Sequence, residues 1–400
     1  MTVFVPGLSG ESLAFFEALK RAPQKTTGVR FIGIHFPGVN KNNYVDLSVR
    51  STQRAYFMQQ HLRSAIDQGR VDLMPLDYIG ALNDLMNAKI DVAIAQVSVP
   101  DTREAVSLGT TYDFLPAVWQ QARIKVAHVN PRMPKTLGSF QINLSDCDLI
   151  CESESSLVTN VTGISSPELS VIAQSVAEQI HDGDTLQLGI GKLPSNVLSA
   201  LGGHRNLRIY SGMITDAVLP LIDCGVIAGD ASIVTGTTLG SEAFYTRLGE
   251  DHTFYFRPVS ETHDVRRIAE IPSFVSINSA VEVDLLGQVN SECVDGQLIA
   301  GIGGMPAFVH GARLSSNGRA IFCLSSTAAK GKVSRIVPML GHGSLVSLPR
   351  HAVDVLITEH GIAYLRGLPI HARAERIIEL AAPSFQQNLS EQWANIRHRL

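Results

Sequence analysis

The chain has 400 residues, more than a single hydrophobic core usually organises, so two or more compact domains are expected. A composition of 45% hydrophobic and 18% charged residues excludes an intrinsically disordered chain. The 33 basic and 37 acidic residues give a formal net charge of −4, which excludes a general electrostatic attraction to nucleic acid or to anionic membranes. We therefore expect any anionic ligand to be held by a local site.

The first residues, MTVFVPGLSGESLAFF, lack the basic region and the cleavage site of a secretory signal. No apolar run reaches the about 18–20 residues that span a bilayer, so we expect a cytoplasmic protein that does not enter a membrane. The cysteines are odd in number and show no CxxC spacing, which indicates free thiols instead of disulfides or a structural zinc site. They are Cys147, Cys151, Cys224, Cys293 and Cys323.

Short β-branched runs alternate with helical patterns along the chain, which is typical of α/β layering with largely parallel sheets. In the first half the pattern predicts strands over residues 29–38, 91–99 and 122–130 and helices over residues 52–69 and 78–89. A polar, Ser- and Thr-rich connector then leads to Pro167 and Glu168 at the start of a helix. The predicted boundaries are a first domain over 1–155, a linker over 156–168 and a second domain over 169–400.

The second half repeats the layout, so we predict two related open α/β domains packed face to face. A helix over residues 169–180 precedes a strand over 185–191 that runs into a glycine turn. Further strands are predicted over residues 207–213, 231–236, 274–278, 320–326, 334–340 and 354–359.

Glycine clusters follow three of these strands, where a ligand can approach backbone N–H groups that a side chain would shield. They are Gly189-Ile190-Gly191, Gly236-Thr237-Thr238-Leu239-Gly240 and Gly301-Ile302-Gly303-Gly304. Each could hold an anion or an oxyanion, although one such cluster alone is more often a tight turn. None has the GxGxxG spacing or the P-loop lysine, which disfavours a Rossmann dehydrogenase.

Two further stretches carry charged groups. The segment KGKVSR at 330–335 mixes cations, a hydroxyl and a flexible glycine, which suits a phosphate as well as a solvated hairpin tip. Glu282 and Asp284 lie two apart on one side of a strand, where buried acids raise each other's pKa, although one of a pair more often caps or pairs with a neighbour. The histidines have no metal-ligand spacing, so no metal site is predicted, and no GxSxG elbow marks a serine hydrolase.

Read in order, these segments resemble the acetyl-CoA hydrolase and CoA-transferase family, in the branch of the 4-hydroxybutyrate and butyrate CoA-transferases. The resemblance covers nearly the whole chain. The matching pieces are GRVDLMPLDY, DVAIAQVSVPD, SLGTTYD, VNPRMPKTLG, DGDTLQLGIGKLP, INSAVEVDLLGQVNSE, IAGIGGMPAFVHGA, SSTAAKGKVSRIVP and VDVLITEHGIAYLRG.

The resemblance implies an active site between two α/β domains, with coenzyme A mainly on the second and Gly303 and Gly304 as the backbone oxyanion site facing the thioester carbonyl. It implies CoA contacts for Gly236, Thr237, Gly240, Gly287, Lys330, Gly331, Lys332, Ser334 and Arg335, and a substrate pocket with Gly189, Gly191, Gly212 and Met213. No metal or organic cofactor is implied beyond CoA, which is a substrate. An acetate-type carboxylic acid as second substrate and a homo-oligomer are also implied.

One departure from the family pattern changes the expected chemistry. Family enzymes attack the thioester with a glutamate from a His-Ser-Glu-Met motif and pass CoA on through an acyl anhydride and a glutamyl-CoA thioester. The corresponding residues here are YSGM at 210–213, so Gly212 replaces the glutamate. A family asparagine further along corresponds best to His263 and Asp264.

Three alternatives follow. In the first, Glu282 or Glu242 reaches the thioester carbonyl and the protein still transfers CoA. In the second, a water directed by His263 or Asp264 attacks the thioester or a β-keto carbon. In the third, the chain is a non-catalytic CoA-binding subunit. The water route fits Gly212 best, because losing the carboxylate removes the covalent route and leaves the oxyanion donors. CoA transfer is the commoner function in the family, and an enzyme of the CoA-transferase or acyl-CoA hydrolase type is expected.

Overall fold

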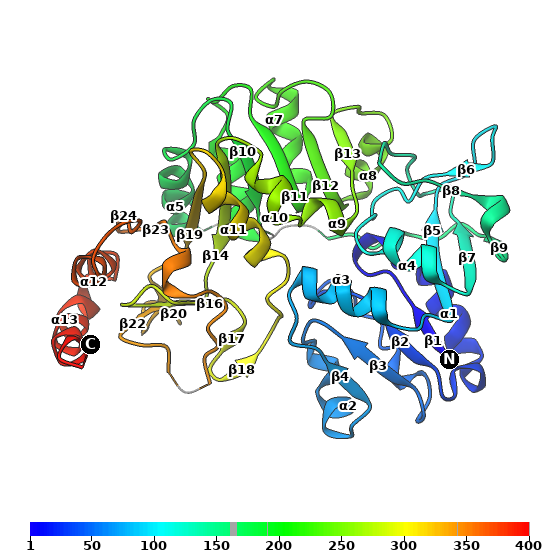
Figure 1. Ribbon diagram of the computed structural model, residues 1–400, viewed down its shortest axis with the longest axis horizontal. Helices are drawn as coiled ribbons and strands as arrows, with labels where there is room; N and C mark the ends of the chain where they lie inside the picture. The colour runs from blue at the N-terminus through cyan, green and yellow to red at the C-terminus, as the bar shows by residue number, and fades with distance from the viewer. Residues whose placement is uncertain (161–165, 190, 342, 400) are drawn as a thin grey trace.

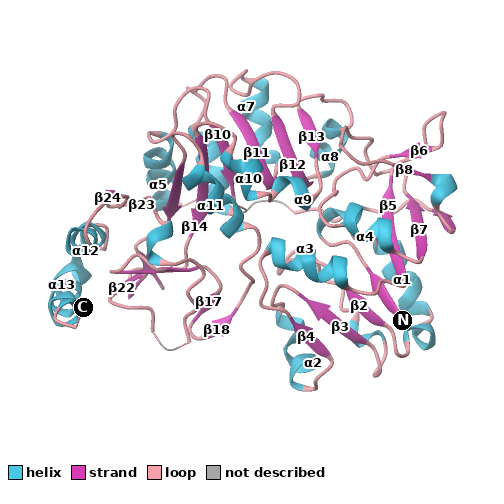
Figure 2. Ribbon diagram, viewed as in Figure 1, coloured by secondary structure: helices cyan, strands magenta, loops and turns pink. Residues whose placement is uncertain are grey.

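The computed structural model describes residues 1–160, 166–189, 191–341 and 343–399, and it contains two open sheets with helices on their faces (Figure 1, Figure 2). The first sheet is drawn in blue and cyan and the second mainly in green to orange (Figure 1). The predicted α/β class with two largely parallel sheets is confirmed.

Within the described residues the first sheet has seven strands, all parallel, and the chain enters at the middle. In spatial order they are β4 (Val71–Leu73), β3 (Thr52–Ala55), β2 (Arg30–Ile32), β1 (Thr2–Phe4), β5 (Val92–Val97), β7 (Ile124–Val129) and β9 (Leu149–Glu152). Strand β5 is buried at five of its six positions, as expected for a parallel strand covered by helices on both faces. The α-helices of this half are α1 (Leu13–Arg21), α2 (Arg63–Asp67), α3 (Tyr78–Asn87) and α4 (Leu115–Gln121).

The second sheet repeats this order around β10, with eight strands in the described part of the chain. They are β13 (Phe254–Phe256), β12 (Ile233–Thr238), β11 (Arg208–Ile214), β10 (Thr185–Leu188), β14 (Phe274–Ser279), β19 (Arg319–Cys323), β23 (Val355–Thr358) and β24 (Gly361–Tyr364). Only β24 runs antiparallel, paired with β23. The α-helices are α5 (Pro167–Ala177), α6 (Lys192–Ala200), α7 (Leu219–Asp223), α8 (Glu242–Leu248), α9 (Val259–Thr262), α10 (Val265–Ala269), α11 (Met305–Leu314), α12 (Ile370–Glu379) and α13 (Pro383–Arg397).

Short strand pairs extend both halves. The pairs are β6 (Ala105–Val106) with β8 (Ile142–Asn143), β17 (Cys293–Val294) with β18 (Gln297–Leu298), and β20 (Thr327–Ala328) with β21 (Val333–Ser334). A three-stranded sheet has the order β16 (Val289–Asn290), β15 (Glu282–Asp284), β22 (Ile336–Val337). Of the strand predicted over 334–340, the structure keeps Ser334 at the end of β21 and the two residues of β22.

One predicted helix is wrong over its first part. Residues 52–69 have helical periodicity, but they begin with β3, and only α2 near their end is an α-helix. Strand β3 lies between β2 and β4 and bonds to both, so pairing with distant residues overrides the local pattern. The predicted domain boundaries stay a prediction, and residues 161–165 of the predicted linker lie outside the described residues.

The two halves meet along the segment 110–113 and strand β12. The backbone N–H groups of Tyr112 and Asp113 both donate to the carbonyl of Gly236, at 2.9 and 3.1 Å. The hydroxyls of Thr111 and Thr237 lie 2.9 Å apart in a buried hydrogen bond. The junction is therefore a hydrogen-bonded interior and not a loose contact. Across the described residues, no helix combines the length and the apolar character that crossing a membrane requires.

Candidate active site

A cavity of about 260 Å³ lies at the carboxyl ends of β10, β11 and β14. The chain runs from β10 to β11 on one side and returns to β14 on the other, so this is the switch point of the second sheet, where open α/β sheets bind ligands. The first half closes the cavity with Phe36, Pro37, Phe57 and Tyr78. The second half lines it with Gln187, Leu188, Gly189, Ser211, Gly212, Met213, His263, Asn278, residues 300–305 and Phe308.

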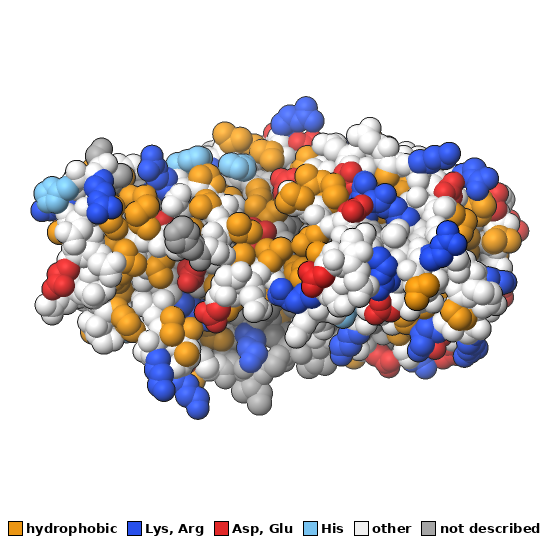
Figure 3. All heavy atoms as spheres, turned by 90° about the horizontal axis from the view of Figure 1, so that it is seen from below, with side chains coloured by type: hydrophobic (Ala, Val, Ile, Leu, Met, Phe, Trp, Pro, Cys, Tyr) orange, Lys and Arg blue, Asp and Glu red, His pale blue; other side chains and the backbone are white. Residues whose placement is uncertain are grey.

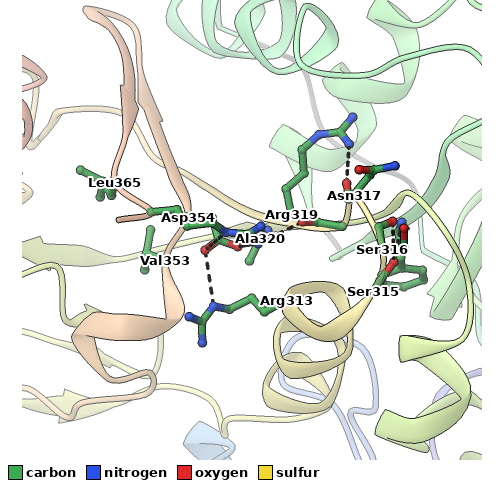
Figure 4. A network of polar contacts seen from close by, with 12 residues as sticks. Arg313, Ser315, Ser316, Asn317, Arg319, Ala320, Val353, Asp354 and Leu365 are labelled. Atoms are coloured by element: carbon green, nitrogen blue, oxygen red, sulfur yellow. Dashed lines mark hydrogen bonds and ion pairs between the residues drawn. The ribbon is translucent and has the colours of Figure 1, made fainter. Parts of the chain in front are cut away.

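Two larger cavities are less suited to chemistry. One of about 590 Å³ lies at the opposite, amino edge of the second sheet. There Asp354 is held by Arg313 at 3.4 Å and by Arg366 at 2.6 Å, and the bond from Arg313 is drawn in Figure 4. The other, of about 510 Å³, contains Glu242, whose carboxylate pairs with Arg132 at 3.3 Å. Glu242 therefore lies away from the switch-point cavity and does not replace the missing glutamate there.

His263 is the titratable side chain most enclosed by the switch-point cavity. It follows α9, is 1% exposed, and its ring stacks on Tyr78 with centroids 4.6 Å apart. Phe308 contacts the ring at 4.7 Å. Burial lowers the pKa of His263 to about 3, so the imidazole is neutral near pH 7. Its Nδ1 lies 2.9 Å from the Thr262 hydroxyl, and no partner for Nε2 occurs among the described residues.

Two glycines make room for this ring. A Cβ atom on Gly212 would lie 2.8 Å from Cε1 of His263, and one on Gly304 would lie 2.2 Å from Nε2. The imidazole therefore fills the space beside Gly212. A water therefore has to reach Nε2 from the cavity and not from the side of Gly212.

The loop before α11 offers backbone donors to the cavity. Gly303 has a φ of 60° that favours glycine, and its carbonyl accepts a hydrogen bond from the Tyr78 N–H at 3.1 Å. In the described part of the chain, the N–H groups of Gly303 and Gly304 donate to no protein acceptor. Because Gly304 caps a ten-residue helix, both amides suit a carbonyl oxygen that becomes negative during reaction.

An amide network at the cavity floor was not predicted from the sequence. The Ser276 hydroxyl donates to Oε1 of Gln187 at 2.6 Å, and Nδ2 of Asn278 donates to the Ser276 hydroxyl at 2.8 Å. The available signal was the polar residue near the end of each apolar strand, TLQL and FVSIN. Tyr78, Phe57 and Phe36 had no comparable signal, because they reach the cavity from the other half.

The predicted acids lie elsewhere. Glu282 accepts hydrogen bonds from Asn290 at 3.0 Å and from Ser344 at 2.9 Å, outside the cavity lining. Asp264 accepts from the Arg266 N–H at 2.9 Å and caps α10. Their predicted catalytic roles do not fit these structural contacts. Among the described lining residues there is no carboxylate.

The predicted CoA contacts divide into two groups. Gly236, Thr237 and Gly240 are buried at the junction of the halves, and a Cβ on Gly287 would lie 2.6 Å from the Arg373 guanidinium. These four positions pack against other parts of the protein, and their contact with CoA stays a prediction.

The basic segment stands at the tip of the β20–β21 hairpin, with Lys330, Gly331 and Lys332 exposed. The Ser334 hydroxyl donates to the carbonyl of Ile336, and the Arg335 N–H donates to that of Ser326. Both interpretations of this segment, a phosphate site and a solvated tip, remain open.

Of the predicted pocket residues, Gly189, Gly212 and Met213 line the cavity. Gly191 caps α6 and belongs to a neighbouring small pocket that shares Gly189 and Met213 with it. Ile190, between the two glycines, lies outside the described residues.

The surface seen from below mixes acidic and basic side chains, with hydrophobic ones gathered toward the middle of the view (Figure 3).

The fold and the cavity define a class: an α/β protein with a glycine-lined cavity at the junction of two largely parallel sheets. Residues 4–162 match the model of the acetyl-CoA hydrolase/transferase N-terminal domain, and residues 240–393 match that of the C-terminal domain. The chain belongs to this acetyl-CoA hydrolase/transferase family, and it is an acyl-CoA-processing enzyme of the transferase or hydrolase type.

Individual relatives agree with this family. The chain is 34% identical to a 4-hydroxybutyrate coenzyme A transferase of Clostridium kluyveri, over 96% of this chain and 91% of the relative. It is 33% identical to a butyryl-CoA:acetate CoA-transferase of Anaerostipes caccae, over 75% of this chain and 71% of the relative. The crystal structure of RipA from Yersinia pestis superposes with a TM-score of 0.92 at 29% identity, covering 99% of this chain and 94% of RipA.

Proposed function

We propose that the switch-point cavity binds the acyl end of an acyl-CoA and that water, not a protein carboxylate, attacks the thioester carbonyl. The carbonyl oxygen would accept the N–H groups of Gly303 and Gly304. Water adds to the carbonyl carbon, the C–S bond breaks, and the products are a carboxylic acid and the CoA thiol. The observation that carries this proposal is the His263 imidazole beside Gly212, in a cavity whose described lining has no carboxylate.

The tautomer of His263 supports this role. With the Thr262 hydroxyl donating its single proton to the carbonyl of Pro258 at 3.3 Å, its oxygen can accept Nδ1–H of His263 at 2.9 Å. Nε2 then carries the lone pair, at a position that can accept a hydrogen bond from a water in the cavity. Such an imidazole orients the water by accepting its hydrogen bond. Because burial lowers its pKa, it is a weak base that holds the water's proton only in passing and gives it to the leaving sulfur.

CoA transfer is the second candidate, favoured by the transferases at 34% and 33% identity. Here an acetate-type carboxylate would take the place of water, form a mixed anhydride and release the CoA thiolate. The thiolate then attacks the acceptor's carbonyl carbon and releases the original acid. Cytoplasmic location and a homo-oligomer stay predictions that accompany either reaction.

One assay separates these candidates. The protein is incubated with acetyl-, butyryl- and 4-hydroxybutyryl-CoA, with and without acetate, while free thiol and the CoA esters are quantified. Thiol release without acetate is expected. Formation of a new CoA ester only with acetate would favour transfer, and a glutamate reduced by borohydride in that reaction would overturn the non-covalent route. Binding of CoA without turnover of any ester would instead indicate a non-catalytic subunit.

A further inference from the structure

Tyr78 belongs to the first half of the chain, yet it contacts two groups of the candidate site in the second half. It is the first residue of α3, whose start is fixed by Asp77, because Oδ1 of Asp77 accepts the Gly80 N–H at 2.7 Å. The Tyr78 side chain is 7% exposed and lines the cavity. Phe114 packs on its ring at 4.9 Å and holds it from the first half.

The backbone of Tyr78 controls the orientation of one peptide group. Its N–H donates to the carbonyl of Gly303 at 3.1 Å. In a trans peptide the C=O and the following N–H point in opposite directions, so this bond also fixes the direction of the Gly304 N–H. Gly303 has no side chain and a φ of 60°, so without the bond little would oppose rotation of this peptide.

The ring of Tyr78 controls the imidazole. It stacks on His263 with centroids 4.6 Å apart and planes 16° from parallel, while Phe308 lies against the imidazole at 4.7 Å. His263 therefore cannot leave its place over Gly212 and Gly304 unless Tyr78 moves.

We propose that Tyr78 is a positioning residue that assembles the site when the two halves dock, by aiming the Gly304 amide with its backbone and holding His263 with its ring. The inference rests on the proposed function for the role of His263, but the contacts themselves can be tested without turnover. Burial is the cause that lowers the pKa of His263, so removing the ring admits water and raises that pKa toward its ordinary value of 6.5.

Other titratable groups around the pair are few. Burial, and after it the nearby Asp113, raises the pKa of Tyr78, and burial raises the pKa of Asp113 itself to about 8. The measurements are therefore made below pH 7, where Asp113 and Tyr78 are both neutral and His263 is the group that changes charge.

The first experiment follows the His263 ring by NMR between pH 4.5 and 7, with its signal assigned by its loss in His263→Asn. We expect the His263 signal to show no titration in wild type and in Tyr78→Phe, and to titrate within this range in Tyr78→Leu. Phe36→Leu, which opens the same cavity from the same half without touching the imidazole, is the matched control. The proposal would be overturned if the pKa of His263 were unchanged in Tyr78→Leu, or if it rose equally in Phe36→Leu. Either result counts even if the protein turns over no acyl-CoA.

The second experiment isolates the backbone bond. Proline is accepted at the first position of a helix, and Asp77 before it has the extended conformation that proline requires, with φ −73° and ψ 178°. Tyr78→Pro therefore removes the N–H and the ring, while Tyr78→Leu removes only the ring. We expect kcat to fall on the order of 100-fold in Tyr78→Leu and about tenfold further in Tyr78→Pro, with KM changing less than about threefold. Equal kcat in the two variants would refute the backbone role, and Tyr78→Met substitutes for Tyr78→Leu if that variant does not fold.

Discussion

The two sheets have the same strand order, but their switch points are used differently. In the second half the loop after β10 leaves a cavity floored by Gln187 and Asn278. In the first half the corresponding loop after β1 is buried throughout, over residues 5–12, and its Glu11 carbonyl accepts a hydrogen bond from Nε2 of Gln96 in β5 at 3.4 Å. Topology therefore offers two equivalent crevices, and the side chains decide which one remains open to a ligand.

The filled crevice is an interior polar network. Glu11 is 1% exposed, and its carboxyl oxygens accept hydrogen bonds from Asn40 at 2.7 Å, Asn42 at 2.9 Å and Tyr44 at 2.9 Å. The Ser9 hydroxyl of the same loop donates to the carbonyl of Thr238 across the junction at 2.6 Å. The first switch point thus stabilises the fold and its junction, whereas the second is free for chemistry.

The largest effect expected from this comparison is at the open switch point. A side chain on Gly304 would overlap Nε2 of His263 and cover the adjacent amides, so Gly304→Val should lower kcat/KM at least 100-fold. Gly202→Ala is the control, because a Cβ there meets no atom within 4 Å. Wild-type kcat/KM in Gly304→Val would show that the site lies elsewhere.

At the filled switch point the effect should be on stability. Glu11→Ala removes an acceptor from the buried Asn40 and Tyr44 and from the half-buried Asn42, so we expect the free energy of unfolding to fall by about 2–4 kcal/mol. Urea unfolding measures this loss. The kcat/KM of the folded fraction should stay within about threefold of wild type, because Glu11 is outside the cavity lining. A specific loss of kcat without destabilisation would make the first crevice catalytic too.

Gly212 sharpens the comparison with the family mechanism. In Gly212→Glu alone, the new Cβ lies 2.8 Å from the His263 ring, which is held between Tyr78 and Phe308. We expect this overlap to lower the free energy of unfolding by about 1–3 kcal/mol. The glutamate should not act as a nucleophile in this single variant. Combining it with His263→Asn frees the space. The double variant is expected to form a glutamyl-CoA thioester with acyl-CoA and acetate, detectable by mass spectrometry of the borohydride-reduced peptide. The same adduct in the single variant would show that the imidazole moves aside readily.

The smallest effect concerns the junction between the two switch points. Asp113 is buried, its Oδ1 has no hydrogen-bond partner among the residues that the structure describes, and burial raises its pKa to about 8. Between pH 3.8 and about 8 the unfolded carboxyl is ionised while the folded one keeps its proton, so native Asp113 contributes a loss of stability as pH rises. Asp113→Asn keeps a neutral side chain and should stabilise the protein by about 1–2 kcal/mol at pH 7 but not at pH 4. Thermal unfolding at both pH values measures this, and equal gains at the two would contradict it.

Much of the fold could be predicted from local pattern. Apolar, β-branched composition and the turn residues that follow predict five of the strands, namely β5, β7, β10, β14 and β23. Strand β3 did not, because its helical periodicity is overridden by pairing with two strands, β2 before it and β4 after it in the chain. The glycine at position 212 and the glycine-rich loop before α11 were also evident from the sequence alone, since both are statements about residue identity. That Gly212 replaces a family glutamate stays a prediction.

What only the tertiary structure decided is which of these residues meet. His263 fills the space beside Gly212, and Tyr78 reaches both His263 and Gly303 from the other half of the chain. The same packing buries Gly236, Thr237 and Gly240 at the junction, although their sequence resembles a ligand-binding turn. Periodicity and turn chemistry act over a few residues, whereas a contact across a domain junction depends on how two complete sheets dock, and no local pattern encodes that.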